Sequence, residues 1–320
     1  MTELQERLCN LLQKGLPICR RPFQQIADRL GCTEQQVLED TRDLCQAGII
    51  RRMGPIINAL ALGKTSTLVM AHVPDSRVHE VVDAVNPLPG VSHNYLRTHH
   101  YNLWFTLQGS SLGEIQDVLS SLADRLGVEF HSLPARRVFK LEVFFDATGR
   151  EHSPHEPQGL PCTGAVELTP VEWRILSDLQ KGLQVESLPF DGLGDEGLKG
   201  IEDLICKGVV RRIGAVVDHH KLGYTANALS VAEVPEDRIA ATGMALACLT
   251  QVSHCYQREP LSGWPYTLYA MVHGRCVDEI RGLVTDLVRS QGLNNVLLLE
   301  TLQEFKKRPV MHTSDGLGHA

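Results

Sequence analysis

The alternation of hydrophobic and polar positions divides the first part of the chain into three short helices. Leucines recur at helical spacing over residues 4–12, and two further helical segments cover residues 23–31 and 33–48. The longer segment begins at Thr33, a residue type that caps helix N-termini, and ends at Gly48. Three short helices in this order predict a helix-turn-helix.

Strand-like patterns follow this helical region. The segment IIRRMGPIIN, residues 49–58, predicts two short strands that meet at a turn formed by Gly54 and Pro55, which would make a wing. Beyond the wing, strand and helix patterns alternate in the order βαββαβ, which is the ferredoxin-like plan. The expected elements are a strand near residues 65–73, a helix near 76–85, strands across 91–107, a helix near 112–126 and a strand near 138–145.

The same succession occurs a second time, so the chain is an internal repeat. Residues 47–64 match residues 207–224 at an offset of 160, and the match includes three glycines and a pair of arginines. With one inserted residue, residues 91–97 align with residues 252–258, and after four more inserted residues Tyr101 aligns with Tyr266. The front of the second copy is damaged, because residues 184–208 hold several glycines and a proline where a compact second helix should stand.

The repeat sets the expected domain organisation, together with the Pro-, Gly- and polar-rich segment between its copies. We predict an α+β protein made of two tandem units, each a winged helix-turn-helix followed by a ferredoxin-like βαββαβ domain. The expected boundaries are 1–62 for the first winged helix-turn-helix, 63–146 for the first ferredoxin-like domain, 147–166 for the linker, 167–222 for the degenerate second winged helix-turn-helix, 223–307 for the second ferredoxin-like domain and 308–320 for a flexible tail.

Composition narrows the class of protein. The 320 residues are 43% hydrophobic and 22% charged, which is typical of a globular protein whose domains each bury a core. No apolar run approaches the roughly 20 residues that span a bilayer, and the segment MTELQERLCNLLQKG lacks the pattern of a signal peptide. The nine cysteines are scattered without a CxxC pair, which favours reduced thiols over disulfides. We therefore expect a cytoplasmic protein without a membrane partner.

Charge argues against DNA as the partner, although the predicted fold contains a helix-turn-helix. The chain carries a formal net charge of −7. The helix that would enter the major groove, residues 33–47, holds four acidic residues against the single Arg42, and its counterpart holds four against Lys199. Phosphates would repel such a helix, so we expect no specific binding to DNA.

Histidines and aromatic residues are concentrated in the two segments VSHNYLRTHHYNLWFTL and VSHCYQREPLSGWPYTLYAMVHG. His93 and His254 align, and each is followed by Tyr and Arg at the same spacing, which favours a function over core packing. His99 and His100 are adjacent on a predicted strand and would point to opposite faces, and we favour His100 because it shares a face with nearby asparagines. The candidate catalytic residues are His93, His100, His254 and His273. Zinc binding is an alternative use of the histidines, but the chain has no HExxH motif and no clustered cysteines.

Basic residues gather beside these histidine segments. The guanidinium fork matches the geometry of a carboxylate, so a set of arginines around one cleft suits a ligand with many carboxylates. The alternative is that each arginine forms an ordinary surface ion pair with one of the many acidic residues. The candidate arginines are Arg51, Arg52, Arg97, Arg136 and Arg137, with Arg211, Arg212 and Arg258 repeating the first three.

Two resemblances follow from these features. A winged helix followed by a ferredoxin-like domain resembles the Lrp/AsnC transcription factors. The histidine segments are more specific: HNYLRTHHYNLWFTL in the first copy, and HCYQR followed by WPYTLYAMVHG in the second, resemble the siroheme decarboxylases, in which two Lrp/AsnC-like chains form one enzyme. The first copy is similar to the AhbA/NirD type and the second to the AhbB/NirL type. The resemblance covers nearly all of both halves and implies a natural fusion of the two partners.

The siroheme decarboxylase resemblance implies loss of carbon dioxide from the acetate side chains at C12 and C18 of siroheme, giving 12,18-didecarboxysiroheme on the route to haem or haem d1. A histidine would supply the proton for the carbon left behind, while the macrocycle accepts the electrons. The protein would need no cofactor of its own, since the substrate carries iron, which a histidine could ligate. The implied substrate-binding residues are the arginines above together with Tyr95, Tyr101, Asn102, Trp104, Tyr256, Trp264 and Tyr266.

The chain departs from the family pattern in its degenerate second helix-turn-helix and in Thr267, where an asparagine would match Asn102. The alternative to an enzyme is an Lrp/AsnC-type regulator that senses a tetrapyrrole or an amino acid. The sequence leaves open which histidine is the acid, the order of the two decarboxylations, and whether the internal pseudo-heterodimer dimerises further. Because the two histidine segments differ in length after their arginines, we expect one pocket to be catalytic and the other largely structural.

Overall fold

The computed structural model describes residues 1–141, 144–149 and 164–318 of the chain. Most of the expected linker, residues 147–166, lies outside these described residues. Contacts group the chain into two compact units, and each unit combines segments from both halves. Of the described residues, the first unit holds 1–63, 144–149 and 164–223, and the second holds 64–141 and 224–318.

The first unit contains the helix-turn-helix regions, and its helices begin where the sequence offers caps. The side chains of Thr2, Thr33 and Thr169 each accept a hydrogen bond from the backbone N–H three residues ahead, which fixes the first turns of three helices. Gly31 ends another helix in the left-handed conformation. The elements are α1 (Glu3–Lys14), α2 (Pro22–Leu30), α3 (Glu34–Gln46), β1 (Ile50–Ile57), α6 (Pro170–Gln180), α7 (Gly197–Cys206) and β6 (Val210–Val217), with short 3-10 turns at Ala59–Leu62, Asp191–Leu193 and His219–Leu222.

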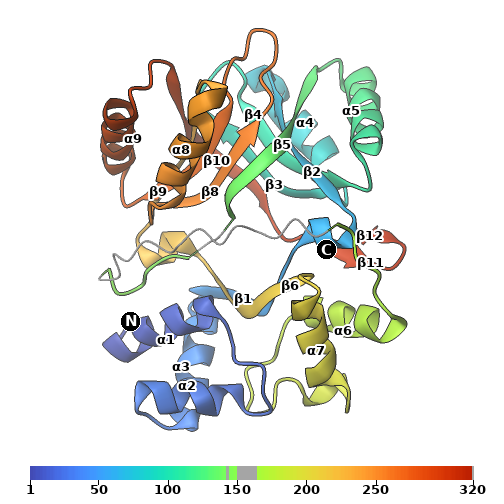
Figure 1. The fold of residues 1–320 in the computed structure, drawn as a ribbon, viewed down its shortest axis with the longest axis vertical. Coiled ribbons are helices and arrows are strands. Elements are labelled where there is room, and N and C mark those ends of the chain that lie inside the picture. Colours follow the sequence, from blue (N-terminus) through green and yellow to red (C-terminus); the bar gives the residue numbers. More distant parts are fainter. Residues whose placement is uncertain (142–143, 150–163, 319–320) are drawn as a thin grey trace. The chain divides into compact units, whose positions relative to one another are not determined.

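The predicted two-stranded wing is wrong in its local form. Residues 50–57 form one continuous strand, β1, which pairs antiparallel with β6 of the other half (Figure 1), so Gly54 and Pro55 lie within a strand. Gly54 pairs with Gly214, and a Cβ atom on Gly214 would lie 2.5 Å from the carbonyl oxygen of Leu12. These glycines permit a close approach of neighbouring backbone and do not form a turn.

The second helix-turn-helix is degenerate, as predicted. Between α6 and α7 the chain forms bends and the 3-10 turn Asp191–Leu193, whereas the first half places the whole of α2 between α1 and α3. Pro189, Gly192 and Gly194 disfavour a regular helix in this segment.

The second unit repeats the order βαββαβ, which confirms the ferredoxin-like prediction for both halves. The helix α5 has the predicted bounds, because Ser111 caps its first turn and Gly127 ends it in the left-handed conformation. The first copy consists of β2 (Thr65–Ala71), α4 (Val78–Val85), β3 (Val91–Arg97), β4 (Leu103–Gly109), α5 (Leu112–Leu126) and β5 (Phe130–Leu141). The second consists of β7 (Ala226–Ala232), α8 (Glu236–Ala247), β8 (Val252–Arg258), β9 (Leu268–Gly274), α9 (Val277–Gln291) and β10 (Val296–Lys307).

The strands of the second unit form one closed barrel in the order β10-β3-β4-β2-β5-β8-β9-β7. Its closure depends on the last strand of each half, which crosses to the other half. β5 pairs with β2 through residues 130–134 and then with β8 through residues 135–141. β10 likewise pairs with β7 through residues 296–300 and with β3 through residues 301–307. The two halves therefore share backbone hydrogen bonds, and within the barrel neither leaves an open sheet edge.

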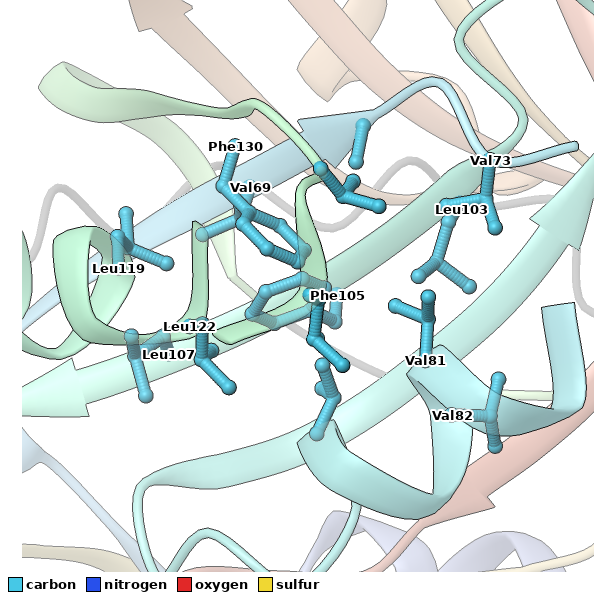
Figure 2. Close-up of a cluster of buried hydrophobic side chains, with 14 of the residues drawn as sticks. Val69, Val73, Val81, Val82, Leu103, Phe105, Leu107, Leu119, Leu122 and Phe130 are labelled. Carbon is cyan, nitrogen blue, oxygen red and sulfur yellow. The ribbon is translucent and has the colours of Figure 1, made fainter. Parts of the chain in front are cut away.

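Hydrophobic side chains fill both faces of this barrel. The helices α4, α5, α8 and α9 lie outside the strands (Figure 1). In the first half, Phe105 and Phe130 meet edge to face at 5.9 Å, with Val81 of α4 and Leu122 of α5 in the same cluster (Figure 2). A matching cluster lies under α8 and α9. A third cluster fills the interior of the barrel and includes Met70, Trp104, Leu133, Leu229, Val231, Trp264, Tyr266, Tyr269 and Leu299.

The C-terminal segment differs from the flexible tail that we expected. Met311–Thr313 and Gly316–Gly318 form two short paired strands, β11 and β12. His312, in the first of these strands, is buried, and burial lowers the pKa of its imidazole to about 4. Among the helices of the described chain, none has the length and apolar character that crossing a bilayer requires.

Candidate active site

The strand β3 carries His93, Tyr95 and Arg97 at alternate positions, so all three side chains lie on one face of the sheet. The rings of His93 and Tyr95 are stacked with their centroids 6.2 Å apart. The guanidinium of Arg97 lies over the Tyr95 ring, 4.8 Å from its centroid. We call this row of three side chains the first ladder, and its arginine lies among residues of the barrel interior.

The strand β8 carries an equivalent row, the second ladder, formed by His254, Tyr256 and Arg258. Its stacked rings are also 6.2 Å apart, and its guanidinium also lies 4.8 Å from the tyrosine ring centroid. The repeat that aligns these residues in the sequence is therefore preserved in their geometry.

Both ladder arginines are buried cations. Arg97 is 3% exposed and donates from Nη1 to the Leu299 carbonyl oxygen at 3.3 Å and to the Thr301 hydroxyl at 2.7 Å. Arg258 is 7% exposed and donates to the Leu133 carbonyl oxygen. In the part of the chain that the structure describes, neither arginine has a carboxylate partner, and neither Nε has a hydrogen-bond acceptor. Burial lowers the pKa of Arg97 to about 10, so its guanidinium remains charged at neutral pH, and burial also lowers the pKa of Arg258.

A serine orients the histidine of each ladder. The hydroxyl of Ser92 lies 2.8 Å from Nδ1 of His93, and the hydroxyl of Ser253 lies 2.8 Å from Nδ1 of His254. A hydrogen bond at Nδ1 fixes the orientation of the ring and leaves the other nitrogen, Nε2, available to exchange a proton with a ligand. Sequence reasoning missed both serines, although the tripeptide VSH occurs in both copies.

The environments of the two histidines differ because different strands lie beside them. β10 places Lys307 opposite His93 and Glu304 opposite Tyr95. The corresponding positions on β5 are apolar, with Leu141 opposite His254 and Val138 opposite Tyr256. The strand beside the first ladder therefore carries an ammonium and a carboxylate, which lie 3.7 Å apart, whereas the side chains at the two corresponding positions beside the second ladder are hydrocarbon. The sequence alone did not reveal this difference, because it depends on which strands cross between the halves.

The pKa of His93 is lowered to about 4, first by burial and then by the positive charge of Lys307. His93 is therefore a neutral imidazole at neutral pH in the absence of a ligand. The negative charge of a bound ligand's carboxylates would oppose the effects of burial and of Lys307 and would raise the pKa of His93.

His100 does not lie on a strand, which corrects our prediction. His99 and His100 belong to the exposed turn between β3 and β4, beyond the arginine end of the first ladder. The His100 ring stacks on the ring of His72 at 3.9 Å, and its carbonyl oxygen lies 2.7 Å from Nδ1 of His72. The structure thus places His100 at a different end of β3 from His93.

The expected stacking residues are largely packed against one another. Trp104 is 1% exposed and donates from its indole nitrogen to the Tyr101 carbonyl oxygen at 2.7 Å. Trp264 contacts Tyr101, Trp104 and Tyr266 with ring centroids between 4.7 and 5.8 Å apart. These four side chains belong to the cluster in the barrel interior, whereas Tyr95 and Tyr256 remain partly exposed.

Asn102 has a structural partner that explains its place in the motif. Its side-chain nitrogen donates to the Val73 carbonyl oxygen at 2.8 Å, and its side-chain oxygen accepts from the Val73 N–H at 2.9 Å. Thr267 makes the same two bonds with Val234, at 2.9 and 3.0 Å. The departure of Thr267 from the family pattern therefore preserves a backbone contact.

The remaining arginines have local partners outside the ladders. In the first unit, Arg51 pairs with Asp218 at 3.0 Å, and Arg211 lies 3.5 Å from the Asn58 side chain. Arg52, whose pKa burial lowers, lines a cavity of about 460 Å³ together with Arg42 and Lys181. Arg212 belongs to β6 of the same unit.

Two further candidates lie on β5. Arg136 pairs with Glu236 and Glu259, and Arg137 lies over the Phe139 ring. Both side chains are exposed. Ordinary surface pairing thus accounts for Arg136, which was the alternative that the sequence left open.

The histidines also raise the question of a metal site. Within the described ranges, no three His, Cys, Asp or Glu side chains converge in a way that would hold a metal ion.

Comparison with known proteins relates the whole chain to one group. The model of the AsnC-like ligand binding domain matches residues 61–140 and 221–306, and the model of the siroheme decarboxylase NirDL-like HTH domain matches residues 5–51. The chain is 36% identical to the siroheme decarboxylase of Hydrogenobacter thermophilus, over 97% of this chain and 95% of that protein. It is 41% identical to the siroheme decarboxylase alpha subunit of Desulfovibrio desulfuricans, over 45% of this chain and 84% of that protein.

Solved structures give the same relation. The crystal structure of the siroheme decarboxylase NirDL is 34% identical, with a TM-score of 0.73 over 96% of this chain and 93% of that one. A second crystal structure of NirDL, in complex with an iron-uroporphyrin III analogue, has a TM-score of 0.72.

Proposed function

Since this chain belongs to the siroheme decarboxylase family, we propose that it is a carboxy-lyase that removes carbon dioxide from the C12 and C18 acetate side chains of siroheme. The product would be 12,18-didecarboxysiroheme, an intermediate for haem or haem d1. The observation that carries the proposal is the duplicated ladder, in which a histidine, a tyrosine and a buried arginine line up on a strand of one barrel, with no carboxylate partner for either arginine among the described residues.

The reaction needs an electron sink and a proton. When the bond between the acetate CH₂ and its carboxylate breaks, the electron pair stays with the CH₂ carbon and is spread into the macrocycle of the substrate. The carbon then takes one proton and becomes a methyl group, while carbon dioxide leaves. We assign the proton to Nε2 of a ladder histidine, because its Nδ1 is already held by a serine.

The ladder arginines would act mainly through their charge. Arg97 and Arg258 are too buried to serve as open clamps, but they place two positive charges in a barrel of low dielectric. That field would draw the carboxylates of siroheme toward the partly exposed histidine and tyrosine of each ladder. Lys307 is positioned for direct contact with a carboxylate beside His93.

We propose that the protein requires no cofactor besides the iron that siroheme brings, and that it works in the cytoplasm as an internal pseudo-heterodimer. Its two halves correspond to the separate subunits of relatives such as the alpha subunit noted above. The helix α3 carries four acidic residues against the single Arg42, which disfavours the alternative of a DNA-binding regulator. Fluorescence anisotropy with duplex DNA should therefore show no specific binding at physiological salt.

Anaerobic incubation of the purified chain with siroheme tests the activity. We expect mass spectrometry to show the loss of first one and then two molecules of carbon dioxide. The control is the double variant His93→Ala, His254→Ala, which should still bind iron-uroporphyrin in an absorbance titration but should not decarboxylate siroheme. A wild-type chain that binds siroheme and leaves it intact would overturn the proposed function.

A further inference from the structure

The second ladder has a hydrogen-bonded extension that the first ladder lacks. The Ser253 hydroxyl lies 2.8 Å from Nδ1 of His254 and also 2.8 Å from Nε2 of His273, which stands near the end of the neighbouring strand β9. Ser253 is 5% exposed and His273 is 8% exposed. One hydroxyl therefore joins two imidazoles in a largely buried chain of hydrogen bonds.

The first half has no titratable group at the equivalent position. β9 pairs with β7 so that His273 lies opposite Asn227, and β4 pairs with β2 so that Gln108 lies opposite Ser66 in the same register. The Ser92 hydroxyl contacts the Thr106 hydroxyl at 2.7 Å instead. A threonine hydroxyl can accept and donate a hydrogen bond, but neither it nor a glutamine takes up a proton from water near neutral pH.

We infer that His273 and Ser253 form a proton relay that resupplies His254, which makes the second ladder the one that protonates the substrate carbon. This inference rests on the proposed function. A proton enters at His273, the Nε2 proton of His273 moves to the Ser253 oxygen, and the Ser253 proton moves to Nδ1 of His254. The Nε2 proton of His254 goes to the carbon that has lost carbon dioxide. One solvent proton is consumed for each carbon dioxide released. Each ring keeps its number of protons but ends with the proton on Nδ1, so both rings have to return to the Nε2–H tautomer before the second proton transfer.

The need for a relay follows from the geometry of the second ladder. A flat macrocycle bound over His254 and Tyr256 would cover the exposed side of the histidine and exclude water from Nε2. Ser253 reaches the opposite nitrogen, so it offers a route that the substrate does not block. Two acetates are lost in succession, so the acid has to be recharged at least once for each siroheme.

The hydrocarbon beside His254 supports the same assignment. A carboxylate next to Leu141 and Val138 would lose hydration without gaining a charged partner from these positions, which favours the neutral product carbon dioxide. Lys307 lies 3.7 Å from Glu304, and a substrate carboxylate that took the place of Glu304 beside this ammonium would be stabilised, so the first ladder is better suited to hold a carboxylate that the substrate keeps. The second ladder is thus suited to the carboxylate that is lost, and the first ladder to a carboxylate that is kept.

Single-turnover measurements on four variants test the relay. We expect Ser253→Ala and His273→Gln to lower the rate of carbon dioxide loss on the order of 10²-fold, the usual scale for general acid catalysis. Ser253→Thr keeps the hydroxyl and should retain most of the rate. Gln108→Ala changes the matched position of the other half and should leave the rate unchanged. The dissociation constant for iron-uroporphyrin should change less than about threefold in all four, since the relay acts after binding.

The rate in mixtures of H₂O and D₂O separates a relay from a structural role. The wild type should show a curved dependence on deuterium content, because several protons move together, and His273→Gln should show a linear one. Wild-type rates in Ser253→Ala and His273→Gln, a loss of iron-uroporphyrin binding, or an unchanged curve in His273→Gln would each overturn the relay. In all these cases the proposed function would stand as long as the wild type decarboxylates siroheme, and it would fail separately if the wild type does not.

Discussion

At the scale of single residues, the histidines that the fold keeps neutral link the site to stability. The pKa values of His93 and His312 are held near 4, against an ordinary value of 6.5, with burial as the main cause. The unfolded chain takes up protons at these positions as the pH falls through 6.5, whereas the folded chain does so only near 4. The free energy of unfolding contributed by these groups is therefore fully present above pH 6.5 and is lost as the pH falls toward 4.

Urea unfolding followed by tryptophan fluorescence, at a series of pH values from neutral to about 4, should show this loss. His93→Gln cannot take up the proton and should show a weaker pH dependence than the wild type. His220→Gln, at an exposed residue of the first unit, is the matched control and should behave like the wild type. Equal pH dependence in wild type and His93→Gln would assign the effect to other groups.

A second prediction at this scale separates the effect of the ladder arginines on ligand affinity from their effect on the free energy of unfolding. Replacing a buried charge that lacks a carboxylate partner by an apolar residue of similar length is often neutral or stabilising. We therefore expect Arg97→Met and Arg258→Met to remain folded, with a midpoint of urea unfolding no lower than that of the wild type. Their affinity for iron-uroporphyrin should fall by roughly 1 to 3 kcal/mol, because the positive field in the barrel is lost.

The exposed Arg137 supplies the control for this measurement, since it lies over Phe139 on the outer part of β5. Arg137→Gln should bind iron-uroporphyrin like the wild type. An absorbance titration gives all three dissociation constants, and unchanged values for both methionine variants would remove the ladder arginines from substrate recognition.

At the scale of elements, the sequence predicted structure best where local signals and tertiary packing agree. α5 has its predicted bounds because Ser111 and Gly127 cap an apolar period of helical spacing. β1 was mispredicted because the Gly54–Pro55 pair reads as a turn, while in the fold these residues lie in a strand that crosses β6. The ladders could be read from spacing alone, but the bond from Ser253 to His273 depends on the register between β8 and β9, which no local pattern encodes.

The close packing of β6 against α1 gives a prediction on Gly214. A methyl group there would lie 2.5 Å from the Leu12 carbonyl oxygen, which is backbone and cannot move aside cheaply. We expect Gly214→Ala to lower the free energy of unfolding by about 1 to 3 kcal/mol, as overpacking does. Gly192→Ala, where a Cβ would meet no atom within 4 Å, should stay within about 0.5 kcal/mol of the wild type in the same urea experiment.

At the scale of the whole molecule, the exchange of β5 and β10 predicts that the halves depend on each other. Without the second half, residues 135–141 of β5 would lose their partner β8, and β3 would lose its partner β10. Both strands would then expose sheet edges. We expect residues 1–156 and 157–320, expressed alone, to aggregate, and the same two pieces expressed together to copurify as one complex. Size-exclusion chromatography distinguishes these results, and a stable monomer of either half would contradict the prediction.

The crossing strands also bear on how such a molecule can diverge. The histidine at which the substrate would be protonated belongs to the second half, but the hydrocarbon beside it, Val138 and Leu141, is encoded in the first; Lys307 beside His93 is encoded in the second. A mutation in the crossing part of a last strand, residues 135–141 or 301–307, thus alters the ladder of the other half. An ancestral pair of identical chains would have had two identical sites, and a change in one gene copy would have made both sites differ at once. When the two genes are joined, each ladder is inherited together with the strand of the other half that lies beside it.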